Sequence, residues 1–198
     1  MPVIAVAGTA GRQQVTEALA RLLGQAGFAV ARADGSGLHL GERRLSTGPA
    51  ANHEGARRAL MNPAATAVVL EVGEHAVLEE GLGFDRCQLA LVTGTRDADT
   101  RIRPGVDEQV TILKAIRAAV DVVLPTGWAV LSRHDPEAVA MAEHCKGQVV
   151  LFGREDWSRW SESPAPEGVE PLLAVAAAAQ VLGVSAPSIQ EFLNSFAD

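Results

Sequence analysis

The clearest indication of the fold is the segment Val3-Ile4-Ala5-Val6-Ala7-Gly8-Thr9-Ala10-Gly11-Arg12-Gln13. It opens with an apolar run of strand length, Val3 to Ala7, and a glycine-bearing turn, Gly8 to Gly11, follows directly. From Gln13 to Ala26 apolar residues recur at three-to-four spacing, which is typical of an amphipathic helix. A turn between a strand and a helix leaves backbone N–H groups and a helix N-terminus pointing outward, and this arrangement suits a phosphate. The candidate binding residues are therefore Gly8, Thr9, Gly11 and Arg12.

Short apolar runs and amphipathic stretches alternate along the rest of the chain. This alternation predicts an α/β fold with a mainly parallel sheet, and right-handed crossovers would place helices on both of its faces. The expected strands are Val3 to Ala7, Ala29 to Ala33, Ala67 to Glu71, Ala90 to Thr93, Trp128 to Leu131 and Gln148 to Phe152. The expected helices are Gln13 to Ala26, Asn52 to Leu60, Gln109 to Val123 and Pro136 to Cys145. A small hairpin is expected at one edge of the sheet, from Leu38 to Ser46 with Gly41 between its two runs.

After Phe152 the pattern changes, which suggests three parts. Residues 1–152 form the α/β core, residues 153–170 form a connector, and residues 171–198 form a helical segment that completes the domain. The connector holds prolines, charges and two tryptophans without a clear period, so it is expected to be a loop whose Trp157 and Trp160 pack onto the domain. A helix is expected from Leu172 to Leu182, and a last short helix follows Ser185, its candidate cap.

Composition and charge narrow the range of functions. The chain has 198 residues, with 17 Lys and Arg against 24 Asp and Glu, so its formal net charge is −7. Hydrophobic residues make up 47% and charged residues 21%, which is ordinary for a packed globular protein. An acidic chain without a cluster of Lys and Arg lacks the positive field that nucleic-acid binding requires, so nucleic acid is not an expected partner.

The apolar runs and the cysteines indicate the compartment. No run approaches the roughly 20 apolar residues that cross a bilayer, so no membrane contact is expected. The N-terminal apolar run has no basic region before it, which favours a buried strand over a signal peptide and a cytoplasmic location. Cys87 and Cys145 are too few for a disulfide framework and lack a metal-ligand spacing, so both are expected to be free, buried thiols.

The glycine turn lacks two groups that a nucleotide-phosphate loop needs. Such a loop uses a Lys that reaches the terminal phosphates and a Ser or Thr hydroxyl that binds Mg²⁺, but Arg12 and Gln13 stand at these positions. An Arg keeps the positive charge, yet its planar guanidinium is not equivalent to an ammonium. Two interpretations stay open: a tight turn without a ligand, or an anion site that Arg12 anchors.

Carboxylates follow the expected strands at the edge where α/β sheets bind ligands. Glu71 ends one strand, and Asp97 and Asp99 follow another, so together they could supply oxygen ligands to Mg²⁺. The alternative is a set of solvated loop carboxylates, which the altered phosphate loop favours.

Several motifs together resemble a known family. Residues Ile4 to Gln13 follow the frame Ile-Ala-Val-Thr-Gly-Thr-Asn-Gly-Lys-Thr, and the run Glu80-Gly-Leu-Gly-Phe-Asp-Arg-Cys87 is distinctive. Further matches are Ala67 to Glu71, Leu91 to Thr93, Pro125 to Leu131 and Met141 to Gly147. On these motifs the chain resembles the central, ATP-binding domain of the Mur ligase superfamily, and most of all the Mur-ligase-like domain of cyanophycin synthetases.

The resemblance implies which groups of the family's site are kept. The family's loop Lys corresponds to Arg12 and the following Mg²⁺-binding Thr to Gln13, so the phosphate loop would be vestigial. The family's Mg²⁺-binding Glu is retained as Glu71, whereas the adenine-reading Asn corresponds to Ser132 and a His near the second metal to Asp99. No catalytic residue is therefore assigned.

Members of that family use ATP to activate a carboxylate as an acyl phosphate, which an amine attacks to form an amide. Because the groups named above are replaced, the resemblance favours a catalytically degenerate domain that acts as a binding or scaffolding module and has no cofactor. The alternative is an ATP-dependent amide ligase module, with ATP and Mg²⁺, that works with a partner domain or chain.

The expected partner is a second copy or a ligase-type protein. Ile189, Phe192, Leu193 and Phe196 lie at helical spacing, so one face of the last helix is apolar. This face either mediates association or packs on the Ala-rich helix of its own domain.

Overall fold

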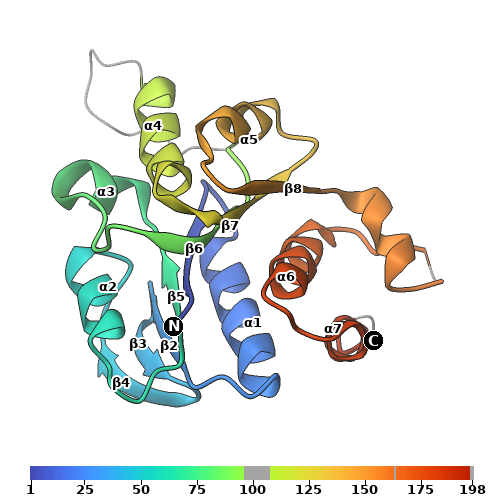
Figure 1. Ribbon diagram of the computed structural model, residues 1–198, viewed down its shortest axis with the longest axis horizontal. Coiled ribbons are helices and arrows are strands. Elements are labelled where there is room, and N and C mark those ends of the chain that lie inside the picture. The colour runs from blue at the N-terminus through green and yellow to red at the C-terminus, as the bar shows by residue number, and fades with distance from the viewer. Residues whose placement is uncertain (96–107, 163, 197–198) are drawn as a thin grey trace.

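The computed structural model describes residues 1–95, 108–162 and 164–196. Its centre is an eight-stranded sheet with the strand order β4-β3-β2-β5-β1-β6-β7-β8 (Figure 1). The strands are β1 (Val3–Ala7), β2 (Val30–Asp34), β3 (Gly37–Leu40), β4 (Arg43–Thr47), β5 (Ala67–Glu71), β6 (Cys87–Val92), β7 (Val123–Ser132) and β8 (Gln148–Phe152). The helices are α1 (Arg12–Gln25), α2 (His53–Leu60), α3 (Glu74–Glu80), α4 (Glu108–Asp121), α5 (Pro136–Ala140), α6 (Glu170–Val181) and α7 (Ala186–Asn194).

The sheet is mostly parallel, as expected. Strand β1 lies between β5 and β6 and pairs with both in parallel, with Val3 opposite Val68 and Ile4 opposite Leu89. Strands β3 and β4 add an antiparallel hairpin at one edge, which confirms the hairpin that the sequence predicts there. The predicted α/β fold is therefore confirmed.

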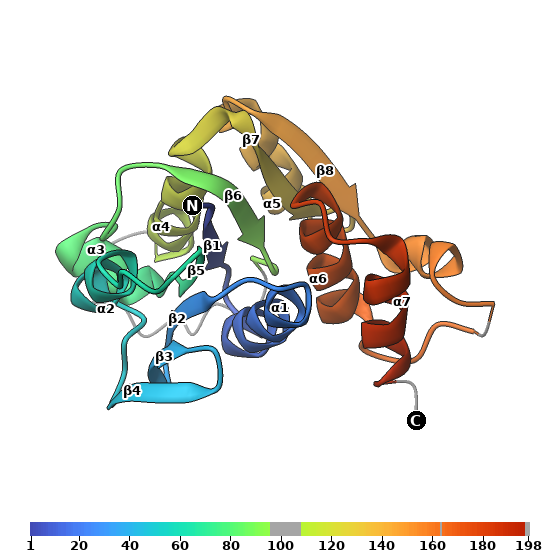
Figure 2. The same cartoon turned by 60° about the horizontal axis from the view of Figure 1, so that its bottom comes forward.

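Helices cover both faces of the sheet. In Figure 1, α2, α3, α4 and α5 lie on one side, and α1, α6 and α7 lie on the other; Figure 2 shows the second layer from another direction. The alternation of side chains along β1 serves both layers. Ile4 and Val6 pack with Leu19 of α1, whereas Ala5 packs on the opposite side with Ile112 of α4. The first strand is thus buried on both faces, which explains why every residue from Ile4 to Ala7 is apolar.

Some boundaries differ from the expected ones. Val123, expected at the end of a helix, instead begins β7, because it is buried and pairs with Cys87 of β6. The expected helix from Pro136 to Cys145 consists of α5 followed by a 3-10 helix, Met141–His144. Helix α3 was not predicted at all.

The connector is more ordered than a loop. It holds a 3-10 helix, Arg154–Arg159, and its Trp157 and Trp160 are only 4% and 9% exposed. Both rings join the core cluster that contains α6, so the expectation that they pack on the domain is confirmed.

The last helix packs on its own domain. Ser185 caps it, since its hydroxyl accepts a hydrogen bond from the Ser188 N–H at 3.3 Å. Ile189, Phe192 and Leu193 are buried in the cluster that contains α1 and α6, and only Phe196 is exposed, at 44%. Of the two alternatives for this apolar face, the structure has the intramolecular one. No helix in the described ranges is long and apolar enough to span a membrane.

Candidate functional site

The turn Gly8 to Gly11 lies at the carboxyl end of β1, near the middle of the sheet, and is fixed to the end of β6. Thr9 N–H donates to the carbonyl oxygen of Gly94 at 2.9 Å, and the Thr93 hydroxyl donates to the carbonyl oxygen of Ala10 at 2.7 Å. Gly8 has φ 135°, and a Cβ added there would lie 2.3 Å from Thr93 Oγ1. Hydrogen bonds to the end of β6 therefore fix the turn, and only a glycine fits at position 8.

Helix α1 begins directly after this turn. Gly11 is its N-cap in the left-handed conformation, with φ 71°, and has no side chain that could cap the first N–H groups. The strand, glycine turn and helix start that the sequence predicts are therefore present.

The Arg12 side chain folds back over the turn and pairs with two carboxylates. Its Nε lies 3.5 Å from Oε1 of Glu71, and its Nη1 lies 2.6 Å from Oε2 of Glu74. Nη1 also donates a hydrogen bond to the carbonyl oxygen of Gly8. The side chains of Arg12, Glu71 and Glu74 are 17%, 9% and 10% exposed, so this ion-pair cluster is shielded from water on most sides.

Glu71, the candidate metal ligand, ends β5 and has protein partners for both of its oxygens. Besides the ion pair of Oε1 with Arg12, Oε2 accepts a hydrogen bond from the Gly35 N–H at 2.8 Å. The other two carboxylates proposed for this site, Asp97 and Asp99, lie outside the described residues. Within the described part of the chain, no group of three or more His, Cys, Asp or Glu side chains is placed to hold a metal.

Gln13 stands at the position of the expected hydroxyl, and its side chain contacts neighbours on α1 and in the β2–β3 turn. Its amide nitrogen donates to Oε1 of Glu17, one turn along α1, at 3.2 Å. Its amide oxygen lies 3.1 Å from the place that a Cβ on Gly35 would occupy. The Gln13 side chain therefore fills the space between the start of α1 and the β2–β3 turn.

Asp135 lies beside the end of β6, next to the Gly8 to Gly11 turn, and its role is not predicted from the sequence. It is 5% exposed and accepts hydrogen bonds from the Thr95 N–H at 2.6 Å and the Thr95 hydroxyl at 2.8 Å. Its Oδ1 also accepts from the Ala138 N–H and caps α5. The Asp-Pro pair at a helix start was the available signal, since it is typical of an N-cap followed by a first-turn proline.

Charged residues follow Ser132 at the end of β7. Arg133 Nη1 lies 2.9 Å from Glu155, and its Nη2 lies 3.6 Å from Asp156. Nε2 of His134 is 2.9 Å from another oxygen of Glu155. A backbone hydrogen bond, and then the hydrogen bond with His134, hold the pKa of Glu155 below its ordinary value. These side chains are thus engaged in a local network with the connector.

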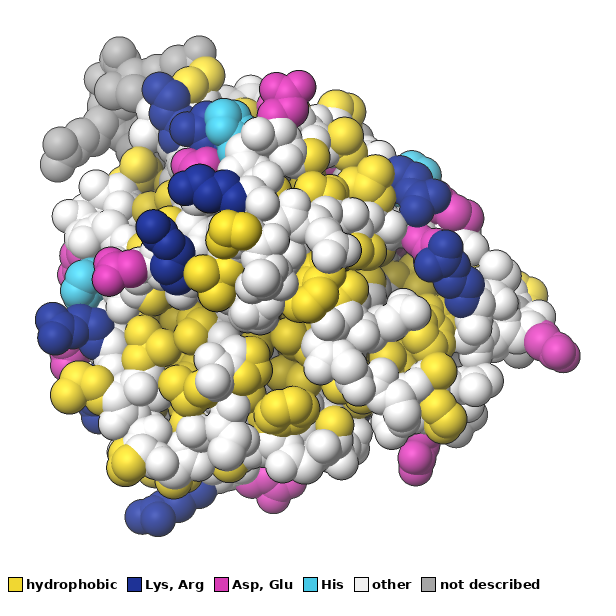
Figure 3. Space-filling view, viewed as in Figure 1, with side chains coloured by type: hydrophobic (Ala, Val, Ile, Leu, Met, Phe, Trp, Pro, Cys, Tyr) yellow, Lys and Arg dark blue, Asp and Glu magenta, His cyan; other side chains and the backbone are white. Residues whose placement is uncertain are grey.

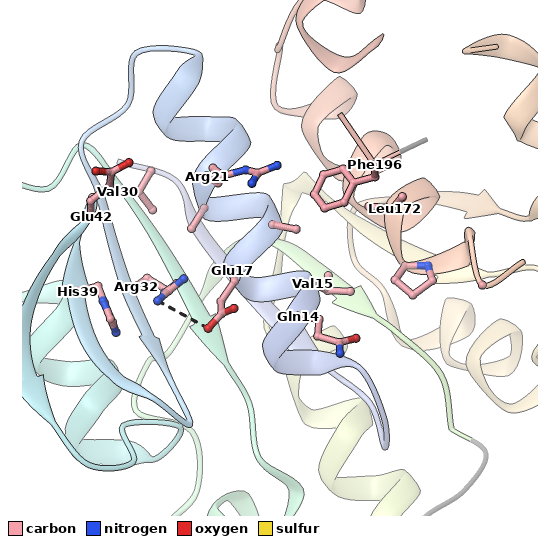
Figure 4. A pocket seen from close by; sticks show the side chains of 15 residues that line it. Gln14, Val15, Glu17, Arg21, Val30, Arg32, His39, Glu42, Leu172 and Phe196 are labelled. Carbon is pink, nitrogen blue, oxygen red and sulfur yellow. Dashed lines mark ion pairs between the residues drawn. The ribbon is translucent and has the colours of Figure 1, made fainter. Parts of the chain in front are cut away.

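A cavity of about 770 Å³ lies between α1, the β2–β3 hairpin and the C-terminal helices (Figure 4). Leu172 and Phe196 line one wall, and Arg32 and His39 reach in from the hairpin. Arg32 pairs with buried Asp34 at 2.8 Å and with Glu17 of α1 at 3.9 Å. Burial, and next the Arg32 guanidinium, lower the pKa of His39. No local sequence pattern indicates this cavity, because its walls come from segments far apart in the chain.

The chain is similar to known proteins both in sequence and in fold. No family model matches the chain. Cyanophycin synthetases from Synechocystis sp. and Crocosphaera subtropica are each 31% identical to it over 159 residues, which is 77% of this chain and 17% of each relative. The chain therefore matches only a small part of these relatives' length.

Solved structures of the same fold cover nearly the whole chain. A UDP-N-acetylmuramoyl-L-alanyl-D-glutamate--2,6-diaminopimelate ligase has a TM-score of 0.75 at 17% identity, and the match covers 99% of this chain and 46% of that one. MurF from Acinetobacter baumannii has a TM-score of 0.69 at 18% identity, over 98% of this chain and 45% of its own. A bifunctional folylpolyglutamate synthase/dihydrofolate synthase has a TM-score of 0.68 at 16% identity, with coverages of 97% and 57%.

Proposed function

We propose that this chain, a domain of the Mur ligase fold that is related in sequence to part of cyanophycin synthetase, is a catalytically degenerate binding or scaffolding module. One observation carries the proposal. The guanidinium of Arg12 folds back over the Gly8 to Gly11 turn and pairs with Glu71 and Glu74. Under the proposal, this side chain takes the place of a nucleotide phosphate and its cation.

The residues present do not fit Mg²⁺ and ATP bound as the resemblance implies. Arg12 replaces the Lys, and Gln13, which replaces the hydroxyl, points to Glu17. Glu71 uses both oxygens within the protein. At the position of the adenine-reading Asn stands Ser132, and the side chains that follow it form ion pairs with the connector. We therefore expect no cofactor.

The size of the electrostatic loss supports this view. Phosphoryl chemistry depends mainly on charge stabilisation and positioning by fixed cations and backbone amides. Removal of one such contact costs roughly 3 kcal/mol of transition-state stabilisation, and three groups are changed here. The loss of even one such contact slows turnover by roughly 10²-fold.

Binding of a partner is the activity that this scaffold retains under the proposal. The partner is a ligase-type protein or a second copy of the chain, in the cytoplasm. Figure 3 shows hydrophobic side chains gathered over the middle of one face, with charged side chains mostly around them, and such surfaces often mark contacts between proteins. The cavity beside α1 is lined by apolar side chains such as Leu172 together with charged ones such as Arg32 and Glu42, and it is large enough for a small ligand.

Calorimetric titration with ATP, with and without Mg²⁺, tests the proposal. We expect no binding at low-micromolar affinity and no ATP hydrolysis. The double variant Arg12→Lys with Gln13→Thr should bind ATP more tightly than the native chain if the loop alone is altered. Arg58→Lys, an exchange of the same kind on the exposed side of α2, is the matched control and should leave ATP binding unchanged. Tight ATP binding by the native chain would refute the proposal.

The ligase alternative has one specific observation in its favour. The relatives detected by sequence are named cyanophycin synthetases, and the chain covers only 17% of their length, so most of each synthetase lies outside the matched part. Under this alternative, a partner domain supplies the missing groups, and ATP and Mg²⁺ bind at Glu71. ATP hydrolysis that arises only when a cyanophycin synthetase lacking its own Mur-ligase-like domain is added would favour it.

A further inference from the structure

Glu71 and Glu74 bring two carboxylates to the same guanidinium in a shielded part of the molecule. They belong to different elements, since Glu71 ends β5 and Glu74 begins α3. Their side chains are 9% and 10% exposed, and both approach the same guanidinium. Two carboxylates in such surroundings repel each other and lose much of their hydration, so the folded chain needs a cation between them.

Arg12 supplies this positive charge as part of the chain itself, so the charge does not dissociate as a bound metal ion would. A guanidinium stays protonated at every pH at which proteins are folded, and its planar donors can serve several acceptors at once. Here one guanidinium forms ion pairs with Glu71 and Glu74 and donates a hydrogen bond to the carbonyl oxygen of Gly8. Glu71 in turn accepts from the Gly35 N–H, so the cluster ties together the β1–α1 turn, β5, α3 and the β2–β3 turn.

We propose that Arg12 is an internal counterion that takes the place of a bound divalent cation. It holds the phosphate-loop turn and the start of α3 in their folded positions without any ligand. This role concerns the stability of the ligand-free domain, so melting curves test it separately from ATP binding.

The test is a set of melting curves with and without millimolar Mg²⁺. Arg12→Met removes the charge and keeps much of the side-chain volume. Because this change leaves two shielded carboxylates unpaired, we expect its melting temperature to fall by on the order of 10 °C. Mg²⁺ should restore part of this loss in Arg12→Met and leave the melting temperature of the native chain unchanged.

Two further variants make the result specific. In the triple variant Arg12→Met, Glu71→Gln, Glu74→Gln, the carboxylates are neutral, so we expect a smaller loss of melting temperature and no effect of Mg²⁺. Arg12→Lys keeps a positive charge and serves if Arg12→Met does not fold. Its melting temperature should lie between those of the native chain and Arg12→Met. If Arg12→Met does not fold, Arg12→Lys should still fold.

The melting temperatures distinguish the counterion role of Arg12 from its replacement of a divalent cation. A native-like melting temperature for Arg12→Met would refute the counterion role. Failure of Mg²⁺ to raise the melting temperature of Arg12→Met, or an equal rise in the triple variant, would refute the substitution of Arg12 for a divalent cation. If Arg12→Met does not fold, the counterion role is refuted when Arg12→Lys and the triple variant are both unfolded as well. ATP binding to the native chain would instead bear only on the proposed function.

Discussion

Gly8 and Gly11 belong to the same turn, but the structure requires them for different reasons. A Cβ on Gly8 would meet both Thr93 Oγ1 at 2.3 Å and the Gly94 carbonyl oxygen at 2.8 Å, in addition to the strain of φ 135°. A Cβ on Gly11 would meet nothing, so only its φ of 71° resists a side chain. We expect Gly8→Ala to lower the free energy of unfolding by about 3 kcal/mol, and Gly11→Ala by about 1 kcal/mol. Urea denaturation of the two variants measures the difference, and equal losses would contradict it.

The two cysteines should differ strongly in reactivity. Burial raises the pKa of the Cys87 thiol to about 12, and its sulfur donates to the carbonyl oxygen of Ala119. Cys145 is partly exposed. Since the thiolate is the reactive form, a thiol reagent at pH 8 should modify Cys145 rapidly and Cys87 only after unfolding. Cys145→Ser is the control and should leave the native chain without a rapidly reacting thiol; rapid labelling of that variant would show that Cys87 is accessible.

His39 predicts a pH dependence of stability. Its pKa is lowered in the folded chain by burial and then by Arg32, so the unfolded chain binds the proton more readily. Stability is therefore complete above the unfolded pKa of about 6.5 and falls as the pH decreases below it. We expect the fall between pH 7 and pH 5.5 to be smaller in His39→Gln than in the native chain. His75→Gln removes an exposed histidine and is the control; an unchanged slope in His39→Gln would exclude this origin.

The sequence could predict Arg12 as the decisive residue of the loop but not its partners. The exchange of Lys for Arg is visible in the motif, and Glu71 is visible as a strand-end carboxylate. The ion pairs are not, because they depend on where α3 begins and on how the side chain turns back over Gly8. Contacts of this kind are set by packing between distant segments, which a local pattern does not record.

At the scale of single elements, Asp135 connects the loop after β6 to the start of α5. Its carboxylate accepts from the Thr95 N–H and hydroxyl and from the Ala138 N–H. Asp135→Ala leaves these buried donors unpaired and removes a helix cap, so we expect the free energy of unfolding to fall by about 3 kcal/mol. Ser185→Ala removes only the exposed cap of α7 and should cost about 1 kcal/mol. Chemical denaturation compares the two, and an equal cost would show that the Thr95 contacts contribute nothing.

Elements with a clear period were predictable, and short ones were not. The strand Val3–Ala7 and the helix that follows it have a long apolar pattern and were found within a residue or two of their bounds. Helix α3 has only seven residues between two glycines and carries too few apolar side chains to show a period. Because α3 was not predicted, its first residue, Glu74, was also missing from the predicted site.

At the scale of the whole molecule, the alternation of strands and helices determined the layers, whereas the contacts between the ends of the chain could not be derived from it. The helices α6 and α7 join α1 in one cluster with the buried tryptophans of the connector. Arg21 of α1 lies over the rings of Phe192 and Phe196, 5.0 Å and 4.9 Å from their centroids. The C-terminal segment is therefore packed against the first helix, and its Ile189, Phe192 and Leu193 are buried within the domain.

This packing changes what a substitution in the last helix should do. Phe192 is buried beneath Arg21, so Phe192→Asp places a charge in the core, and we expect the free energy of unfolding to fall by at least about 3 kcal/mol. Phe196 is 44% exposed, so Phe196→Asp should cost about 1 kcal/mol or less. Because most of the apolar face is covered by the chain itself, neither variant should change the mass of the native species measured by light scattering at high concentration. A dimer that Phe196→Asp dissociates would instead show that the exposed end of this helix joins two copies.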